Sequence, residues 1–237
     1  MELGVNIDHI ATLRNARGGA EPGVLDAAVI SERLGVSAVT IHLREDRRHI
    51  KDTDVLELKH ALRTHINLEM AATQEMQEIA LRVLPHSCCL VPEKRQELTT
   101  EGGLDVASQK EKMAKFIKPL QEKGIIISLF IDPNEEQVRA SAQIGADFIE
   151  LHTGSYAKAF GTPDEEKEFQ RFKESAKLAQ SLGLKVNAGH GLNYENVQRM
   201  HEIEGLVELN IGHSIISRAV FVGLKKAVEE MQEIIQA

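Results

Sequence analysis

The chain of 237 residues lacks several features that would assign it to common protein classes. It has no Trp, and its two cysteines, Cys88 and Cys89, are adjacent, so they cannot build a disulfide framework or a CxxC metal site. Positive charge is in deficit, since 28 Lys and Arg stand against 36 Asp and Glu, giving a formal net charge of −8. Nucleic acids and anionic membranes need a basic surface, so the composition argues against both as partners.

Long apolar runs and leader-like features are also missing. No stretch approaches the ~20 apolar residues that a membrane span requires. The N-terminal MELGVNIDHI carries an acid where a signal peptide has a basic region. The nucleotide-binding patterns GxGxxG and GxxxxGK[ST] do not occur. We therefore expect a cytoplasmic enzyme or binding protein.

What the sequence does contain is a regular alternation of strand-like and helix-like segments. Eight segments in 237 residues give about 30 residues per strand–helix unit, which is typical of βα repeats. This count favours a single α/β domain over 1–237, a (β/α)₈ barrel, over an open doubly wound sheet, whose first turn is usually glycine-rich. The predicted strands, short and rich in Val, Ile and Leu, are 3–7, 38–43, 66–70, 88–91, 125–131, 148–152, 184–188 and 207–211.

Amphipathic segments between these strands predict helices, as at 25–34 and 109–123. Helix ends carry the expected residues. The predicted N-terminal caps are Asp54, Thr73, Asn134, Asp164 and Asn193, and the predicted closing glycines are Gly35, Gly124, Gly145 and Gly183. The longest segments left over, 44–53, 92–106 and 153–163, all follow strands, so in a barrel they lie at the C-terminal mouth, where active sites are built.

Polar side chains interrupt the ends of strands that should be continuously apolar. They recur with period two, so each set can line the barrel lumen. His42 and Glu69 end neighbouring strands, and a Glu and a His in such a pocket suit an acid/base pair. Alone, Glu150 and Glu208 fit more simply as members of a satisfied core network. The residues of this pattern are Asn6, Asp8, Thr40, His42, Arg44, Asn67, Glu69, Glu150, His152, Asn187, Glu208 and Asn210.

Histidines gather at the same rim, and this raises the question of a metal. Six of the ten histidines fall at strand ends or in the following loops: His9, His42, His49, His152, His190 and His213. Neither HxH nor HExxH spacing occurs, so a metal site would have to assemble its ligands from different strands. We therefore predict no metal.

Two glycine-bearing turns suggest phosphate binding, because backbone N–H groups and a helix N-terminus after the last two strands often hold phosphate in barrels. These turns are NAGHGLN at 187–193 and NIGHSII at 210–216. REDRRHI at 44–50 suggests a second anion site, although a solvated charge run is the commoner meaning of such a cluster. Arg14 and Arg17 add two guanidinium groups after the first strand, and TTEGGLD at 99–105 suits a ligand clamp or a lid hinge.

The motifs as a set resemble one family, the deoxyxylulose-dependent pyridoxine 5′-phosphate synthases of vitamin B6 biosynthesis. The resemblance covers nearly the whole chain and involves the segments after almost every strand. Its segments are GVNIDHIATLRNAR, IHLREDRRHI, NLEMA, LVPEKRQELTTEGGLD, SLFID, FIELHTG, LKVNAGHGL and ELNIGHSIISRAV.

The resemblance implies a reaction and an assembly. The family condenses 3-amino-2-oxopropyl phosphate with 1-deoxy-D-xylulose 5-phosphate, giving pyridoxine 5′-phosphate, phosphate and water. No metal or organic cofactor takes part, and the enzyme is a homo-octamer of barrels with extra helices. Two phosphorylated substrates agree with two anion sites, and several proton transfers agree with more than one acid/base group.

The resemblance also implies roles for individual residues. His42 and Glu69 match the family's bases, and His190 matches its proton donor. Asn6, Arg17, Gly191, Gly212 and His213 match contacts to the aminoketone phosphate, and Asp8, His9, Arg44, His49 and Thr99 match contacts to the deoxyxylulose phosphate. Segment 158–169 is the part that fits the family pattern least clearly.

Three other functions stay open beside this one. Another cofactorless phosphosugar isomerase or aldolase would need only one phosphate site. A metal-dependent hydrolase would use Asp8, His42, Glu69, His152 and His190 as ligands. A non-catalytic protein that binds phosphorylated metabolites would tolerate loss of Glu69.

Overall fold

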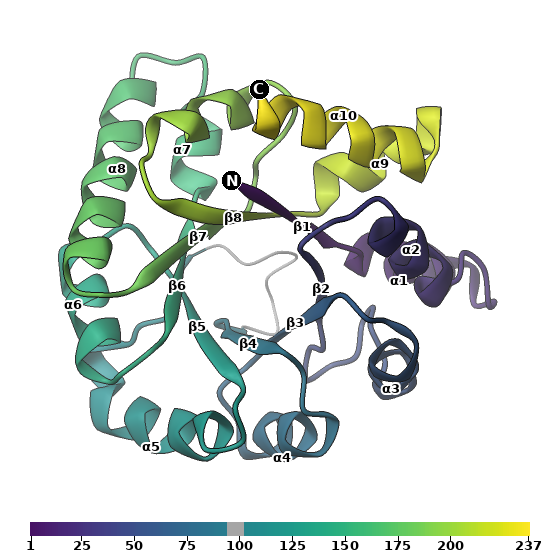
Figure 1. Cartoon of the computed structure of the whole chain (residues 1–237), viewed down its shortest axis with the longest axis horizontal. Helices are drawn as coiled ribbons and strands as arrows, with labels where there is room; N and C mark the ends of the chain where they lie inside the picture. The colour runs from purple at the N-terminus through teal and green to yellow at the C-terminus, as the bar shows by residue number, and fades with distance from the viewer. Residues whose placement is uncertain (94–101) are drawn as a thin grey trace.

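The computed structural model describes residues 1–93 and 102–237, and its centre is a closed barrel of eight parallel strands (Figure 1). Each strand pairs with the next along the chain, and the eighth pairs with the first. The predicted (β/α)₈ barrel is therefore confirmed. The strands are β1 (Glu2–Asn6), β2 (Ala38–His42), β3 (His65–Met70), β4 (Ser87–Leu90), β5 (Ile126–Ile131), β6 (Phe148–His152), β7 (Lys185–Gly189) and β8 (Leu206–Ile211).

Helices follow the strands and cover the outside of the barrel (Figure 1). The segments predicted at 25–34 and 109–123 are the helices α2 and α5, displaced by no more than two residues at either end. The helices are α1 (Asp8–Arg17), α2 (Val24–Arg33), α3 (Asp52–Ala61), α4 (Gln74–Val83), α5 (Lys110–Gln121), α6 (Glu135–Gln143), α7 (Gly154–Ala159), α8 (Glu165–Ser181), α9 (His213–Val222) and α10 (Leu224–Gln236), with 3₁₀ turns η1 (Ala107–Gln109) and η2 (Asn196–Glu202).

Helix ends are set by local chemistry, and three of the five predicted N-terminal caps, Thr73, Asn134 and Asp164, occupy the cap position. The side chains of Thr73 and Asn134 accept backbone N–H bonds at the starts of α4 and α6. Asp164 occupies the cap position of α8 without such a bond, and Asn193 accepts two N–H bonds just before η2. The four closing glycines all have positive φ, a conformation that glycine adopts without strain.

The prediction of Asp54 as a cap is wrong. Helix α3 begins two residues earlier, at Asp52, and Lys51 precedes it as the N-cap. Asp54 instead reaches back from the third helical position to accept the N–H of Lys51. Its carboxylate also holds both terminal nitrogens of Arg14, so the acid ties α1 to α3.

Two further expectations are corrected at the ends of strands. Asp8 does not extend β1, because Ile7 leaves the extended conformation and α1 begins at Asp8. The segment 153–163 is not a simple loop, since it contains α7. Gly154, the first residue of α7, lies so close to His152 that an added Cβ would sit 2.4 Å from the ring nitrogen Nε2.

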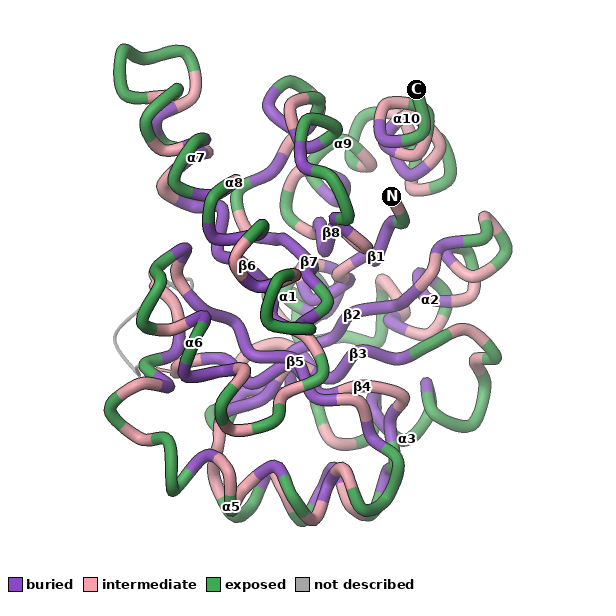
Figure 2. Tube along the Cα trace, turned by 60° about the vertical axis from the view of Figure 1, so that its left-hand side comes forward, coloured by how far each residue is buried: buried purple, intermediate pink, exposed green. Residues whose placement is uncertain are grey.

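Strand side chains alternate between two environments. Those facing outward pack with the helices in one large apolar cluster, and the strands are buried nearly throughout (Figure 2). Those facing inward include polar groups that meet across the lumen: Thr40 Oγ1 donates to Asn210 at 2.6 Å, and Asn210 Nδ2 donates to Glu150 at 2.9 Å. Because these bonds join strands that are not neighbours, the polar residues line the barrel interior, as their period of two predicts.

None of the helices in the described parts of the chain is both long enough and apolar enough to cross a membrane.

Candidate active site

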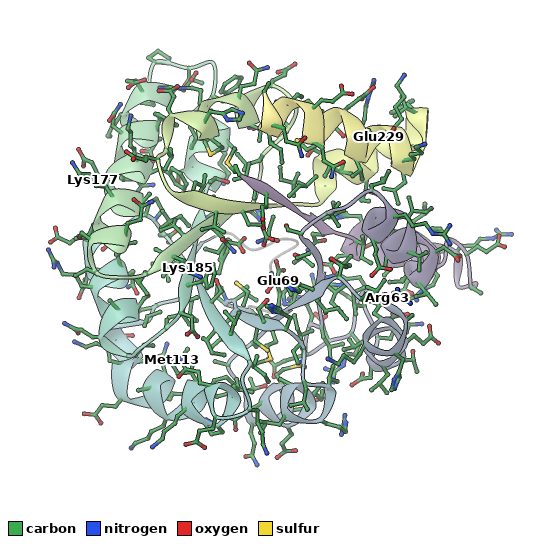
Figure 3. The ribbon with its side chains drawn as sticks, in the orientation of Figure 1. Arg63, Glu69, Met113, Lys177, Lys185 and Glu229 are labelled. Atoms are coloured by element: carbon green, nitrogen blue, oxygen red, sulfur yellow. The ribbon has the colours of Figure 1, made fainter. Side chains whose placement is uncertain are left out.

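The ends of β2 and β3 bring the predicted acid/base pair together. His42 and Glu69 are register partners on these neighbouring strands, and Glu69 lies among the strand ends that surround the lumen (Figure 3). His42 Nδ1 is 3.7 Å from Glu69 Oε2, and both side chains are largely buried. This separation is too long for a hydrogen bond. The two groups therefore face each other, and both atoms can still form a hydrogen bond with a ligand.

Glu69 lies in surroundings that favour its neutral form. Burial and the nearby carboxylates of Glu150 and Asp8 raise the pKa of Glu69 well above its ordinary value. Its exposed fraction is 16%, enough for contact with a ligand at the mouth. A carboxyl group of this kind can give a proton at neutral pH and take it back.

A second carboxylate, Glu93, contacts His42 from the other side. Glu93 Oε1 lies 2.9 Å from His42 Nε2, and Glu93 Oε2 accepts the backbone N–H of Glu45 at 3.0 Å. The sequence interpretation missed this residue. Its position three residues after the end of β4, in a segment expected at the mouth, is the signal that could have indicated it.

His190 lies in the turn after β7, as predicted, and has a positive φ of 81°. Burial, together with the nearby His152 and Lys158, lowers the pKa of His190 to about 4. The imidazole is therefore neutral at pH 7. To act as the proton donor that the resemblance implies, it must donate a neutral N–H or first receive a proton from a reacting group.

A second histidine, His152, contacts His190 and is itself held by a carboxylate. The rings of His152 and His190 meet edge to face at 5.0 Å, and His152 Nδ1 lies 2.9 Å from Asp132 Oδ1. The bond from His152 lowers the pKa of Asp132 below its usual range against the opposing effect of burial. An ionised Asp132 accepts a hydrogen bond from Nδ1–H of His152, and Nε2 of His152 is buried and has no partner among the described residues. Asp132 was not predicted.

Several predicted binding residues cluster beside His42. Asp8 Oδ1 accepts the backbone N–H of His42 at 2.8 Å, and Asn6 Nδ2 donates to Asp8 Oδ2 at 2.9 Å. His49 Nδ1 lies 4.0 Å from Asp8 Oδ1. The ring of His9, the residue after Asp8, meets the ring of His213 edge to face at 5.0 Å.

Within the described residues, one group of side chains has the geometry of a metal site. The ligand atoms of Asp8, His42 and His49 lie within 4.8 Å of one another. Several of these atoms already have partners, because His49 Nδ1 accepts the N–H of Ile50 and His42 Nε2 meets Glu93. The absence of a metal stays a prediction.

The two glycine turns after β7 and β8 are as predicted, and space requires glycine at both positions. A Cβ on Gly191, whose φ is +80°, would lie 2.8 Å from the Cβ of Ala157. A Cβ on Gly212 would lie 2.9 Å from the Cβ of Asn6. Gly212 directly precedes α9, whose ten residues begin at His213, so the first N–H groups of this helix, which have no acceptor within it, follow this position.

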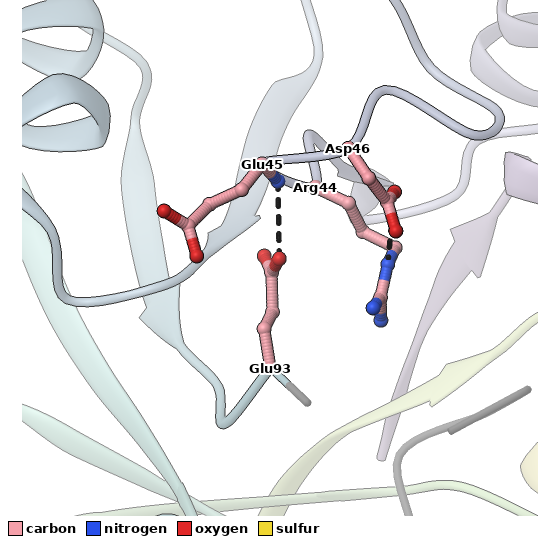
Figure 4. A pocket seen from close by; sticks show the side chains of 4 residues that line it. All are labelled: Arg44, Glu45, Asp46 and Glu93. Carbon is pink, nitrogen blue, oxygen red and sulfur yellow. Dashed lines mark hydrogen bonds and ion pairs between the residues drawn. The ribbon is translucent and has the colours of Figure 1, made fainter. Parts of the chain in front are cut away.

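The predicted arginines differ in availability. Arg17 is exposed at the end of α1, whereas Arg14 is buried in its ion pair with Asp54. Arg44 is buried and contacts Asp46, and these two residues line a pocket with Glu45 and Glu93 (Figure 4). The 44–50 cluster is thus ion-paired in large part, since Arg47 and Arg48 also meet carboxylates. Thr99 lies outside the described residues.

Comparison with known proteins decides the family. Residues 3–237 match the family described as pyridoxal phosphate biosynthesis protein PdxJ. The chain belongs to this family. A curated relative from Geobacter sp. (strain M21), named pyridoxine 5′-phosphate synthase, is 56% identical over 234 residues, which covers 99% of this chain and 98% of the relative. A relative of the same name from Neisseria meningitidis serogroup A is 54% identical over 98% of this chain and 96% of its own length.

Membership of the PdxJ family confirms the predicted resemblance and the prediction of a vitamin B6 biosynthetic enzyme. Solved structures of lower similarity add evidence on the fold alone. The tryptophan synthase α-subunit of Pyrococcus furiosus superposes with a TM-score of 0.64 at 12% identity, covering 99% of this chain and 97% of that one. Phosphoribosyl anthranilate isomerase from Thermus thermophilus gives 0.56 at 15% identity, covering 91% and 88%.

Proposed function

We propose that the mouth of this barrel condenses 3-amino-2-oxopropyl phosphate with 1-deoxy-D-xylulose 5-phosphate to form pyridoxine 5′-phosphate, phosphate and water. The observation that carries the proposal is the pair His42 and Glu69, opposed at 3.7 Å on register partners of β2 and β3. Amine attack on a ketone, loss of water and enolisation each move a proton, and this pair offers one base and one acid at the same place.

In this proposal His42 and Glu69 act on the first stages of the reaction. Nδ1 of His42 takes a proton from the attacking amine or from the carbon beside a carbonyl. Glu69, whose pKa is raised by burial and by Glu150 and Asp8, gives a proton to the departing hydroxyl. The carboxylate left behind then serves as the base for the next proton, so the same two groups handle successive steps.

His190 acts later and from another side of the mouth. It is neutral in the free protein, because its pKa is about 4 as a result of burial and of the nearby His152 and Lys158. The negative charges of two bound phosphates oppose these effects and raise the proton affinity of the ring. His190 can then hold a proton released in an early step and return it during ring closure.

The remaining predicted residues divide into two anion sites. Asn6, Arg17, Gly191, Gly212 and His213 serve the aminoketone phosphate. The start of α9 and the close packing of Gly212 on Asn6 support this part. Asp8, His9, Arg44, His49 and Thr99 serve the deoxyxylulose phosphate, and the cluster around Asp8 supports that part.

The assay that tests this function uses the purified full chain, both substrates and no added metal. Freshly generated aminoketone phosphate is mixed with deoxyxylulose phosphate, and released phosphate and the pyridinol product are followed by absorbance and mass. Product that requires both substrates supports the proposal. Turnover of either phosphate alone points to an isomerase or aldolase, and activity lost with a chelator and restored by a metal points to a hydrolase.

The proposal includes a homo-octamer in the cytoplasm. Large apolar side chains on α9 are exposed in the single chain, 85% for Phe221 and 71% for Val220, and this supports burial against other copies. The two adjacent thiols of Cys88 and Cys89 are buried and free, with the pKa of Cys88 raised by burial to about 12. Unpaired cysteines are usual in a reducing compartment.

A further inference from the structure

Glu93 occupies a buried position between two loops of the mouth. Its side chain is only 5% exposed, and each oxygen has a close partner in the described part of the chain. Oε2 accepts the backbone N–H of Glu45, in the segment after β2, and Oε1 meets Nε2 of His42 at 2.9 Å. Figure 4 shows the first of these bonds and shows the side chain of Glu45 extending away from it. Glu93 therefore joins the segment after β4 to the end of β2.

The partners of Glu93 determine which nitrogen of His42 carries the proton. Burial raises the pKa of Glu93, but the hydrogen bonds from His42 and from the backbone N–H of Glu45 outweigh it, so the pKa lies below the ordinary value. An ionised carboxylate can only accept hydrogen bonds. At 2.9 Å from this oxygen, Nε2 must be the donor.

A neutral imidazole with its proton on Nε2 has its lone pair on Nδ1. In His42 this free nitrogen is the one that faces Glu69, at 3.7 Å. We propose that Glu93 is a positioning residue that fixes His42 in the Nε2–H tautomer and so presents Nδ1 as the base opposite Glu69. It also stabilises the imidazolium that forms when Nδ1 takes a proton.

This inference rests on the proposed function, in which His42 Nδ1 is a base. Glu93 does not touch the substrates in this account. Its effect is exerted through His42, so a change at Glu93 should lower kcat and leave the KM of both phosphates nearly unchanged. If Glu93 served folding alone, a change there would lower stability without lowering kcat selectively over KM.

The decisive variant is Glu93→Gln, which keeps the size of the side chain. The N–H of Glu45 still needs an acceptor, so the amide oxygen of the substituted side chain turns toward it and the NH₂ group faces His42. Nε2 must then become the acceptor, and the proton moves to Nδ1. We expect kcat to fall about 10²-fold or more, in the range of a lost general base. Glu93→Asp, which keeps the charge, should recover part of this loss.

Glu45→Gln is the matched control, because it removes a carboxylate from the same pocket and keeps the backbone N–H that Glu93 accepts. We expect it to retain the kcat of the unchanged protein. Equal kcat for Glu93→Gln and Glu45→Gln would overturn the proposal. So would equal loss in Glu93→Gln and Glu93→Asp, since charge and tautomer would then not matter.

The tautomer itself can be measured without turnover. The ring signals of His42 in ¹⁵N-histidine-labelled protein are assigned as those that disappear in His42→Gln. At pH 7.5 in the unchanged protein, their ¹⁵N shifts should show a protonated Nε2 and a bare Nδ1. Glu93→Gln should reverse them. A bare Nε2 in the unchanged protein refutes the inference even if the enzyme is active. The expected tautomer in a protein that makes no pyridoxine phosphate instead refutes the proposed function.

Discussion

Glu69 combines a raised pKa with access to the mouth, and it is the single residue on which the proposed chemistry depends most. Burial and the carboxylates of Glu150 and Asp8 favour its neutral form. Glu69→Gln keeps the shape and the neutral charge but cannot exchange a proton. We expect kcat to fall by about 10²–10⁴-fold, while both substrates still bind when titrated calorimetrically.

The control for this prediction is Glu57→Gln, which changes an exposed carboxylate on α3. It should retain normal turnover. If Glu69→Gln also kept more than about a tenth of the normal kcat, Glu69 would not be an acid/base group, because such a group contributes at least about 10²-fold.

His190 makes a testable contribution to the pH dependence of stability. Its pKa is lowered from 6.5 to about 4, so the unfolded chain binds the proton more readily than the folded one. The stability associated with the neutral ring is complete above pH 6.5 and is lost as the pH falls toward 4. From pH 7.5 to pH 5 this loss amounts to about 2 kcal/mol.

Urea unfolding of the unchanged protein and of His190→Gln at these two pH values measures the effect. The variant should lose about 2 kcal/mol less stability on acidification. His9 and His49, whose pKa values are also lowered by burial, contribute equally to both proteins, so the difference isolates His190. Parallel pH dependence in the two proteins would contradict the lowered pKa.

For single residues, the sequence predicted the histidines and Glu69 at the mouth better than it predicted the carboxylates that contact these histidines. His42, Glu69 and His190 all lie at the mouth, because a polar residue at the end of a buried strand is costly unless it meets a partner or a ligand there. Glu93 and Asp132 were missed for a physical reason. A carboxylate in a polar loop resembles any solvated acid, and only the folded structure shows that each one holds a histidine.

At the scale of whole elements, the glycine turn after β7 is under steric constraint. Gly191 has a φ of +80°, and an added Cβ would meet the Cβ of Ala157 at 2.8 Å. Gly191→Ala therefore combines backbone strain with a clash between the turn and α7. We expect it to lower the free energy of unfolding by about 2–4 kcal/mol and to raise the KM of the aminoketone phosphate.

Gly124→Ala separates the two causes. Gly124 also has a positive φ, +77°, but an added Cβ would have no neighbouring heavy atom within 4 Å. This control should lose only the ~1–2 kcal/mol of the strained backbone and keep its kinetic constants. Equal losses of stability in urea unfolding of the two variants would show that packing against Ala157 is not a constraint.

Strands were the best-predicted elements, with every boundary within one residue of the observed one. The reason is that a barrel strand is buried on both faces, against the helices and against the lumen, and therefore has a nearly continuous run of apolar residues. The errors lie where local side-chain interactions or turn-forming residues obscure the hydrophobic pattern of a helix. Asp54 resembles a cap but lies inside α3, and α7 is hidden in a segment whose Gly, Thr and Pro residues resemble a loop.

At the scale of the whole molecule, the barrel carries carboxyl groups in its interior. Burial raises the pKa of Glu150 to about 8 and also raises the pKa of Glu208. Glu150 accepts a bond from Asn210, and Glu208 accepts one from Ser37, so the sequence interpretation of both as members of a core network agrees with their contacts. Glu150 also raises the pKa of Glu69, so a carboxyl group inside the lumen affects the protonation of a group at the mouth.

The outer surface carries the features that bear on assembly. Helix α9 packs against both α1 and α10 at the edge of the barrel (Figure 1). On these packed helices Phe221 is 85% exposed, Val220 71% and Leu13 55%. Burial of one Phe side chain is worth about 1.5–3 kcal/mol, and in an assembly this gain is repeated in every subunit. The interface of the proposed octamer is therefore expected at these exposed side chains.

Phe221→Ser tests the predicted octamer through this surface. We expect sedimentation velocity at micromolar concentration to show an octamer for the unchanged protein and smaller species for the variant, because each contact loses its largest apolar side chain. Leu182→Ser is the control, since Leu182 is 39% exposed at the end of α8, and it should leave the assembly intact. An unchanged protein that sediments as a monomer would refute the octamer. An octamer that survives Phe221→Ser would show that its interfaces lie on another face.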